Sequence, residues 1–178
     1  MSGDCYYFNP KYIYYFYDNF NLKSIFVKFF WMTKIPPPIL VLILVMSIYF
    51  SQNQLEIIYV PYKHSISILL LLAGTLILIN PVFKFIKSKT TVNPVKFAKV
   101  NKLVTSGIYK YSRNPMYLGM ILIIISTSIF YLNYYSMLTP FIFYFWINRF
   151  QIKREENFLK EKFGKEYLSY MSKTRKWI

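Results

Sequence analysis

The stretch LVTSGIYKYSRNPMYLG, residues 103–119, organises the rest of this chain of 178 residues. It places two glycines, a proline, three tyrosines and an arginine directly before a long apolar run. Gly107 and Gly119 permit close approach of a ligand, because glycine tolerates backbone angles that other residues avoid. Pro115 suits the first turn of the following helix, where a backbone N–H would have no partner. This mixture predicts half of a binding site at the polar boundary of a membrane helix.

Arg113 and two adjacent glutamates are the candidate chemical groups. The Arg113 guanidinium offers a fork of donors to a carboxylate, although an arginine here also suits the simpler task of holding a helix end at the interface. An ion pair with Lys160, four residues further along the helix, would explain Glu156 without a binding role. It does not account for Glu155, since adjacent side chains point about 100° apart on a helix. We therefore expect the second half of the site at Glu155 and Glu156.

A helical hairpin joins the two halves. The third apolar run, residues 115–132, is followed by the turn LNYY and a fourth run, residues 135–150, which contains Pro140. So short a turn makes the two helices antiparallel. The chain then returns to the surface where the glycine-containing stretch begins, which brings both halves of the site together.

Two further apolar runs precede this hairpin. Residues 36–51 predict a first membrane helix that is shorter than the roughly 20 residues usual for a span. Residues 65–83 predict a second, in which Pro81 kinks the cytoplasmic end. Within it, Gly74 is expected to let a neighbouring helix approach closely.

After the fourth run the pattern changes to amphipathic helices on the membrane surface. Apolar residues recur there at helical spacing, at Phe158, Leu159 and Phe163. Gly164 is a good C-terminal cap, and a second short helix is expected over residues 166–171. Trp177 and Ile178 suit an anchor at the membrane interface.

The connections alternate in charge. Residues 84–113 carry eight Lys/Arg and no Asp/Glu, and residues 149–178 carry nine Lys/Arg and four Glu. The loops at residues 51–64 and 131–135 are nearly neutral. This positive-inside pattern predicts both termini and the central connection in the cytoplasm, facing anionic lipid head groups. The net charge of +15 therefore reflects topology and argues against a nucleic-acid partner.

Together these features predict an all-α integral membrane protein with about four transmembrane helices and a cofactor pocket at its cytoplasmic face. Residues 1–31 lack the pattern of a secretory signal, and Met32 opens the phrase MTKIPPPILV, which resembles a natural start. We expect residues 1–31 to be a dispensable extension and residues 32–178 to be the membrane domain. Cys5, the only cysteine, permits no intramolecular disulfide.

The sequence lacks the familiar catalytic and nucleotide-binding motifs that would identify a ligand. The sequence has no zinc-type cluster, GxSxG, P-loop or GxGxxG. His64, the only histidine, falls on the non-cytoplasmic side in this topology, which excludes a catalytic histidine on the cytoplasmic face. No metal site is expected.

The two halves of the site together resemble the superfamily of isoprenylcysteine carboxyl methyltransferases and phospholipid methyltransferases. The resemblance rests on LVTSGIYKYSRNPMYLG, the hairpin, and REENFLKEKFGKEYLSYMSKTRKWI, and it covers residues 93–178. The phrase TKIPPPILV is also similar to the start of bacterial members. The resemblance implies that S-adenosylmethionine binds at the cytosolic membrane face without a Rossmann fold.

The resemblance also implies roles for single residues. The expected cofactor-binding residues are Asn101, Lys102, Leu103, Val104, Tyr109, Asn114, Pro115, Met116, Tyr117 and Glu155, with Pro94 nearby. The expected catalytic residues are Arg113, Glu155 and Glu156. The family often has histidine where this chain has Asn101 and Asn114, and asparagine cannot titrate. The carboxyl methyltransferases have arginine at Gln151, a task that Arg149, Lys153 or Arg154 would have to take over here.

The implied reaction is direct transfer of the sulfonium methyl group to a membrane acceptor held in line. The leading acceptor is the carboxylate of a lipid-modified cysteine, which needs no strong base, and a phospholipid amine is the alternative. Two other classes remain open. One is a non-catalytic membrane protein of this fold, and the other is an NADPH-dependent membrane reductase with Lys102, Lys110 and Arg113 as phosphate ligands.

Overall fold

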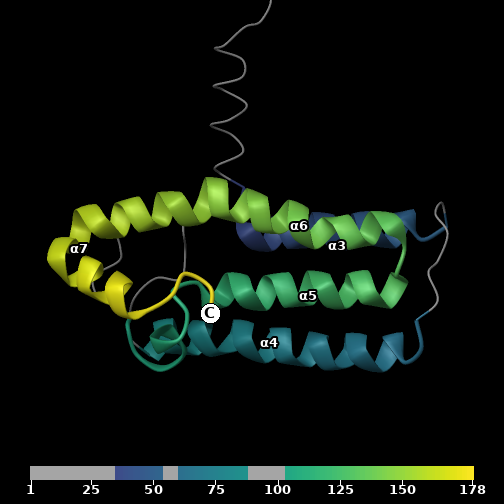
Figure 1. The fold of residues 1–178 in the computed structure, drawn as a ribbon, viewed down its shortest axis with the longest axis horizontal. Helices are drawn as coiled ribbons and strands as arrows, with labels where there is room; N and C mark the ends of the chain where they lie inside the picture. The colour runs from purple at the N-terminus through teal and green to yellow at the C-terminus, as the bar shows by residue number, and fades with distance from the viewer. Residues whose placement is uncertain (1–34, 54–59, 88–102) are drawn as a thin grey trace, which may run out of the picture. The chain divides into compact units, whose positions relative to one another are not determined.

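The computed structural model describes residues 35–53, 60–87 and 103–178, which belong to one compact unit, Ile35–Ile178. The elements in chain order are α3 (Pro37–Ser51), α4 (Lys63–Lys87), the 3₁₀-helix η2 (Gly107–Lys110), α5 (Pro115–Tyr131), α6 (Tyr134–Trp146), the π-helix η3 (Ile147–Ile152) and α7 (Lys153–Lys173) (Figure 1). These ranges contain no β-strand, so the predicted all-helical class is confirmed. The predicted boundary between residues 31 and 32 lies outside the described residues.

Helix α5 lies at the centre of this unit, because α3, α4 and α6 all pack against it. Pro115 occupies its first turn, as predicted, and the preceding Asn114 is its N-cap residue. Proline also starts α3, where Pro36 is the N-cap. Pro81, by contrast, does not end α4, which continues to Lys87. Prolines thus mark where α3 and α5 begin but do not mark where α4 ends.

Small residues hold α4 and α5 close together along a shared seam. A methyl group added to Gly119 would lie 2.7 Å from the carbonyl oxygen of Gly74 and 2.8 Å from the backbone nitrogen of Leu78. Seven residues before Gly74 on α4 and seven residues after Gly119 on α5, the hydroxyl groups of Ser67 and Ser126 each donate to the other's backbone carbonyl, at 2.8 and 2.7 Å. The predicted close approach at Gly74 is therefore confirmed, and its partner is Gly119.

The hairpin between α5 and α6 turns on two residues. Leu132 takes a left-handed conformation (φ 48°), and Asn133 then caps α6 by accepting from the backbone N–H of Ser136 at 2.7 Å. Asn133 also donates to the Ser51 hydroxyl at 3.4 Å, which ties the end of α3 to this turn. Because the turn is so short, the starts of α5 and α7 come to the same end of the unit, as predicted.

The predicted end of the fourth helix near residue 150 is wrong. Helix α6 continues without a break through the π-helix η3 into α7. The physical reason lies in the sequence, since no glycine or proline interrupts residues 141–163. The first such residue, Gly164, does break the helical backbone (φ 49°, ψ −121°), as expected, and the helix then resumes and ends at Lys173 rather than Met171.

The helices expose many large apolar side chains. On α4, Leu69 and Leu76 are each 69% exposed, and α3 and α6 expose Leu42 and Phe145 similarly. Among the described residues, only the stretch Lys63–Phe83 has both the length and the apolar character needed to cross a membrane (mean hydropathy 2.4). Two shorter apolar helices, Pro37–Ser51 and Pro115–Tyr131, accompany it.

Candidate active site

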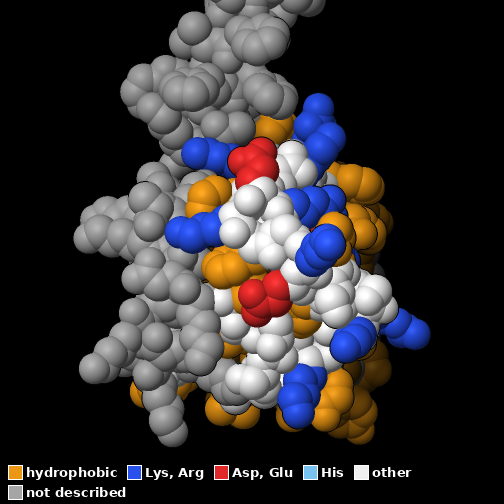
Figure 2. All heavy atoms as spheres, turned by 90° about the vertical axis from the view of Figure 1, so that its left-hand side faces the viewer, with side chains coloured by type: hydrophobic (Ala, Val, Ile, Leu, Met, Phe, Trp, Pro, Cys, Tyr) orange, Lys and Arg blue, Asp and Glu red, His pale blue; other side chains and the backbone are white. Residues whose placement is uncertain are grey.

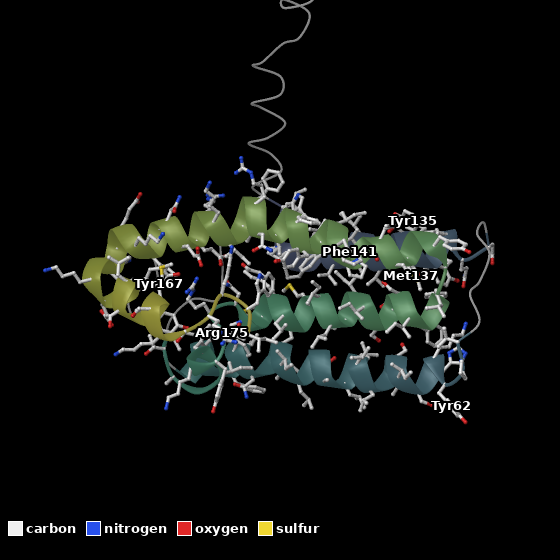
Figure 3. All side chains as sticks on the ribbon, viewed as in Figure 1. Tyr62, Tyr135, Met137, Phe141, Tyr167 and Arg175 are labelled. Atoms are coloured by element: carbon white, nitrogen blue, oxygen red, sulfur yellow. The ribbon has the colours of Figure 1, made fainter. Side chains whose placement is uncertain are left out.

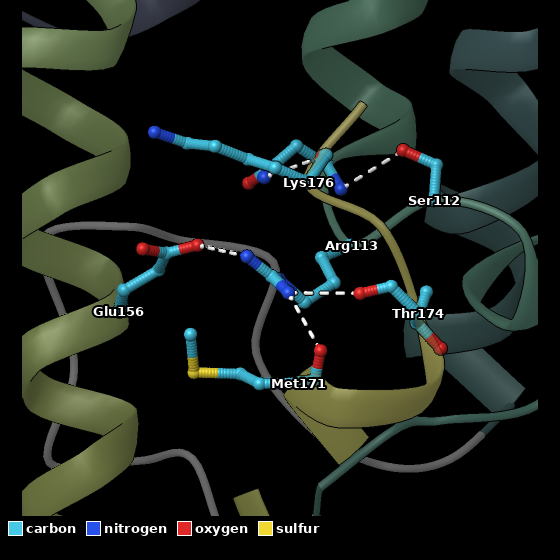
Figure 4. A network of polar contacts seen from close by, with 7 residues as sticks. Ser112, Arg113, Glu156, Met171, Thr174 and Lys176 are labelled. Carbon is cyan, nitrogen blue, oxygen red and sulfur yellow. Dashed lines mark hydrogen bonds and ion pairs between the residues drawn. The ribbon is translucent and has the colours of Figure 1, made fainter. Parts of the chain in front are cut away.

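Arg113 lies just before α5 and clamps three segments together (Figure 4). Its Nη2 donates to Oε1 of Glu156 at 2.9 Å, and both side chains are mostly buried (11% and 16% exposed). Its Nη1 donates to the backbone carbonyls of Thr174 (2.8 Å) and Met171 (3.2 Å) at the end of α7. A planar guanidinium suits this geometry, because its donors diverge in one fixed fork. The structure thus brings the predicted pair Arg113 and Glu156 into direct contact.

The segment after α7 is fastened to the loop before α5 by further bonds. The backbone N–H of Arg113 donates to the carbonyl of Arg175, and the Asn114 side chain donates to the carbonyl of Lys176, both at 3.0 Å. The Tyr170 hydroxyl donates to the carbonyl of Tyr109 at 2.6 Å. Residues 174–176 are therefore held against the loop before α5, which contains predicted site residues.

The Trp177 side chain, an expected anchor at the membrane interface, packs against the helices. Its ring lies 5.4 Å from the ring of Tyr144 on α6, and it packs against the apolar core that includes Tyr117 and Met120. Of these last two residues, Ile178 is the exposed one. The indole thus fixes the end of the described chain against the helices.

Glu155 meets the first turn of α5 at Tyr117. Its Oε1 accepts two hydrogen bonds, from the hydroxyl of Tyr117 (2.5 Å) and from Nε2 of Gln151 (2.6 Å). Within the described residues no donor reaches its second oxygen, Oε2. The predicted pairing of the two halves of the site is therefore seen twice, at Tyr117–Glu155 and at Arg113–Glu156.

Burial dominates the electrostatics of this carboxylate. Removal from water raises the pKa of Glu155 to about 7, although the bonds from Tyr117 and Gln151 and the charge of Arg154 oppose the rise. Burial likewise raises the pKa of Tyr109 and Tyr167 well above the ordinary tyrosine value. Glu155 therefore changes its charge near neutral pH, and a nearby positive charge would stabilise its ionised form.

The remaining predicted residues fall into three groups. Pro115 and Met116 lie in the first turn of α5, beside Tyr117, and Tyr109 is buried in η2. Leu103 and Val104 lie partly buried in the segment that leads to η2. Asn101, Lys102 and Pro94 lie outside the described residues.

Two features lay beyond the sequence prediction. Gln151 was noted only as a departure from an arginine, yet it is 4% exposed and touches Glu155. Its spacing of four residues from Glu155 is the signal that identifies it. The carbonyls of Thr174, Arg175 and Lys176 give no such signal, because every residue has a carbonyl group.

Among the described residues, potential metal ligands do not gather at this site. The parts of the chain that the structure describes contain no cluster of three His, Cys, Asp or Glu side chains. His64 lies at the opposite end of the helices, where its ring contacts Phe130 near the end of α5 (centroids 4.9 Å). Figure 3 shows the ends apart, with Tyr167 and Arg175 at the α7 end and Tyr62 and Tyr135 at the other.

Comparison with known proteins gives one family and several relatives. A family model described as phospholipid methyltransferase matches residues 62–166, more than half of the chain. A protein of Haemophilus influenzae described only as uncharacterized is 43% identical over 63 residues, 35% of this chain and 100% of its own length. The protein-S-isoprenylcysteine O-methyltransferase of Saccharomyces cerevisiae is 40% identical over 74 residues, 40% of this chain and 30% of the yeast protein.

A probable protein-S-isoprenylcysteine O-methyltransferase of Oryza sativa subsp. indica is 34% identical over 90 residues, 49% of this chain and 46% of the rice protein. The match thus spans less than half the length of these named relatives. No solved structure gives a significant match to the chain.

Proposed function

Because the chain belongs to the phospholipid methyltransferase family, we propose that it is an S-adenosylmethionine-dependent methyltransferase acting on a lipid or lipid-modified acceptor in a membrane. The observation that carries this proposal is Glu155, a largely desolvated carboxylate with one oxygen held by two donors and the other without a donor among the described residues. A carboxylate in this state favours a positively charged ligand, which would offset the cost of its burial.

The described residues fit the proposed cofactor. When bound, S-adenosylmethionine supplies a methyl group on a positively charged sulfur. In this proposal Glu155 attracts the positively charged amino group of the cofactor, which S-adenosylhomocysteine also carries, and Tyr109, Tyr117 and Met116 provide the apolar surface around the ligand. The burial of Glu155 keeps water away from its carboxylate, which strengthens the electrostatic attraction at the site.

The leading acceptor is the carboxylate of a lipid-modified cysteine, in keeping with the names of the yeast and rice relatives. A carboxylate oxygen would form a bond to the methyl carbon as the bond from sulfur to that carbon breaks, giving a methyl ester and a neutral thioether. No proton is transferred, so a site without a titrating histidine is sufficient. The chain's contribution is to hold the two reactants in line.

A phospholipid amine is the second candidate acceptor, and the Arg113 clamp favours it. The Arg113 guanidinium is already occupied by Glu156 and two carbonyls, so a substrate carboxylate would have to compete for it. An amine needs no such cation and would gain from the negative charge of Glu155. The family model, named for phospholipid substrates, agrees with this alternative.

We further propose that the protein spans the membrane several times, with the α7 end at the cytoplasmic surface. The exposed apolar faces of α3, α4 and α6 would then meet lipid. Figure 2 views the α7 end, where Lys and Arg side chains are spread around a few acidic ones. Such a surface suits anionic head groups, whereas the opposite end presents Tyr62 and Tyr134.

Calorimetric binding to the full chain in detergent tests the cofactor. We expect saturable binding of S-adenosylhomocysteine, loss of that binding in Glu155→Ala, and no comparable binding of NADPH. Glu161→Ala is the matched control, because Glu161 is an exposed glutamate on the same helix. Unchanged affinity in Glu155→Ala would refute the site. Binding of NADPH alone would identify a reductase, and binding of neither ligand would identify a non-catalytic relative.

The acceptor is tested separately with S-adenosylmethionine that carries a radioactive methyl group. An N-acyl-S-prenylcysteine and vesicles of an aminophospholipid are offered in parallel. Label released by mild base from the first product indicates a methyl ester, and base-stable label in lipid indicates methylation of the amine. No transfer to either acceptor, despite cofactor binding, would contradict both acceptor assignments.

A further inference from the structure

Glu155 is held from two separate elements of the fold. Tyr117 reaches it from the first turn of α5, and Gln151 reaches it from the π-helix η3, one turn earlier on its own helix. Both donors converge on Oε1, at 2.5 and 2.6 Å, and both side chains are buried (7% and 4% exposed). Two short bonds hold Oε1 in place, and no donor among the described residues reaches Oε2.

The π-helix explains why Glu155 occupies this position. Thr139, Phe143, Ile147, Gln151 and Glu155 follow at intervals of four residues, and the first four are fully or almost fully buried. A regular α-helix turns about 100° per residue, so from Thr139 to Glu155 it would turn about 160° beyond four full turns. Glu155 would then point away from α5. The wider turn of η3 absorbs most of this rotation and keeps Gln151 and Glu155 on the α5 side.

We propose that Tyr117 and Gln151 are positioning residues that hold Glu155 ionised and present its Oε2 to the positively charged amino group of the cofactor. This inference rests on the proposed function, since it assigns these residues to the same site. A hydrogen bond to a carboxylate favours its charged form, so each donor counteracts the effect of burial. Without the donors Glu155 would retain its proton at neutral pH and would attract a cation weakly.

Other charged groups around Glu155 do not replace these donors. Glu156 and Arg154 flank it on α7, Tyr109 faces it from η2, and Tyr167 lies further along the same helix. Arg113, the cation at the start of α5, is bound to Glu156. Arg154 is exposed, so solvent screens its effect on the Glu155 carboxylate.

The test follows the affinity for S-adenosylhomocysteine from pH 5.5 to 9 in Tyr117→Phe and Gln151→Met. We expect the midpoint of the pH dependence to rise by about one unit in each variant, which corresponds to the loss of one hydrogen bond to a carboxylate. At pH 7 this shift weakens binding by about fivefold, and the affinities converge again above the new midpoint. The ligand's own amino group titrates identically in all variants and cancels in the comparison.

Two substitutions serve as matched controls. Tyr131→Phe makes the same chemical change at the far end of α5, where the ring contacts Tyr49 and Phe130. Asn148→Leu removes an amide from the same π-helix, where it bonds the carbonyl of Tyr144. Both controls should keep the wild-type midpoint. Weaker binding at every pH with an unmoved midpoint in Tyr117→Phe and Gln151→Met would overturn the inference, because it would indicate a purely structural role.

A measurement without ligand separates this inference from the proposed function. The chain has five glutamates, so carbon-13 labelling of their carboxyl groups gives few signals, and Glu155→Gln identifies the one that is lost. We expect that signal to titrate at higher pH in Tyr117→Phe and Gln151→Met than in the wild type. If it titrates unchanged, the inference fails, even where the wild type binds the cofactor. If no cofactor binds while the signal shifts, the proposed function fails and the holding of Glu155 by these two donors remains.

Discussion

At the scale of single residues, Glu155 combines a stability cost with the binding role proposed for it. Its pKa in the folded protein is about 7, above the ordinary value of 4.5, because burial disfavours the charge. Between these two values the folded state binds more protons than the unfolded state, so the free energy of unfolding falls as pH rises through this window. Above pH 7 the destabilisation caused by the buried charge of Glu155 is fully present, and a bound cation would reduce it.

We therefore predict that Glu155→Gln is more heat-stable than the wild type at pH 8 and about equal to it at pH 4.5. Glutamine can accept the bonds from Tyr117 and Gln151 without carrying a charge. The measurement is the thermal midpoint in detergent at both pH values, with Glu161→Gln as an exposed control. A difference that does not grow between pH 4.5 and pH 8 would contradict the assignment.

The Arg113–Glu156 pair gives a second prediction at this scale. Glu156→Gln leaves a mostly buried guanidinium without its counter-charge, which costs about 3 kcal/mol in buried pairs. Because the same guanidinium holds the carbonyls of Met171 and Thr174, we expect the segment after α7 to loosen. Trypsin should then cut after Lys173, Arg175 and Lys176 faster than in the wild type or in Glu161→Gln. Equal cleavage rates would show that Arg113 does not control this segment.

Residue-level prediction succeeded where side chains carry the signal. Adjacent glutamates and an arginine before an apolar run were enough to indicate that Arg113, Glu155 and Glu156 meet. The pairing of each glutamate with its own partner could not be predicted, because it depends on how far the π-helix rotates α7. The carbonyl ligands of Arg113 could not be predicted either, because backbone groups are the same at every position.

At the scale of elements, the seam between α4 and α5 depends on two glycines. A methyl group at Gly119 would meet backbone atoms of Gly74 and Leu78 at less than 3 Å, so the helices would have to separate. We expect Gly119→Ala to lower the free energy of unfolding by about 1–3 kcal/mol. Ser67 and Ser126, further along the seam, would lose part of their paired bonds as the helices separate.

A double-mutant cycle checks this interpretation. Once Gly119→Ala has separated the helices, Gly74→Ala should cost less than it does alone, since both methyl groups occupy the same contact. Gly164→Ala is the control for additivity: the left-handed backbone at Gly164 (φ 49°) makes alanine costly there, but its methyl group meets nothing within 4 Å, so its cost should simply add to that of Gly119→Ala. Additive effects at Gly74 and Gly119 would contradict the shared contact.

The helix boundaries show why elements are predicted unevenly. Prolines and the NYYS cap mark the starts of α3, α5 and α6, and those starts agree with the sequence prediction within a few residues. The passage from α6 into α7 was missed because the change from apolar to charged residues resembles the end of a span. A helix that passes from an apolar to an aqueous environment, however, continues until a residue such as Gly164 breaks it.

At the scale of the whole molecule, the described unit supports a prediction about the N-terminal residues. The unit begins at Ile35, and the described hydrogen bonds of the site all join residues from 109 onward. We expect a chain that starts at Met32 to keep both its affinity for S-adenosylhomocysteine and its thermal midpoint. Loss of either in that chain would show that residues 1–31 contribute to the site or to the fold.

The fastening of residues 174–176 to Arg113 and Asn114 also sets an order of events during synthesis. Helices α3 to α6 can begin to pack before the chain is finished, but Trp177, which packs on Tyr144 and the apolar core, joins them last. The carbonyls of residues 174–176, which hold Arg113 and Asn114, are also made after α7. A chain cut before Thr174 would therefore lack the bonds that fasten the loop before α5, and under the proposed function it should bind S-adenosylhomocysteine weakly.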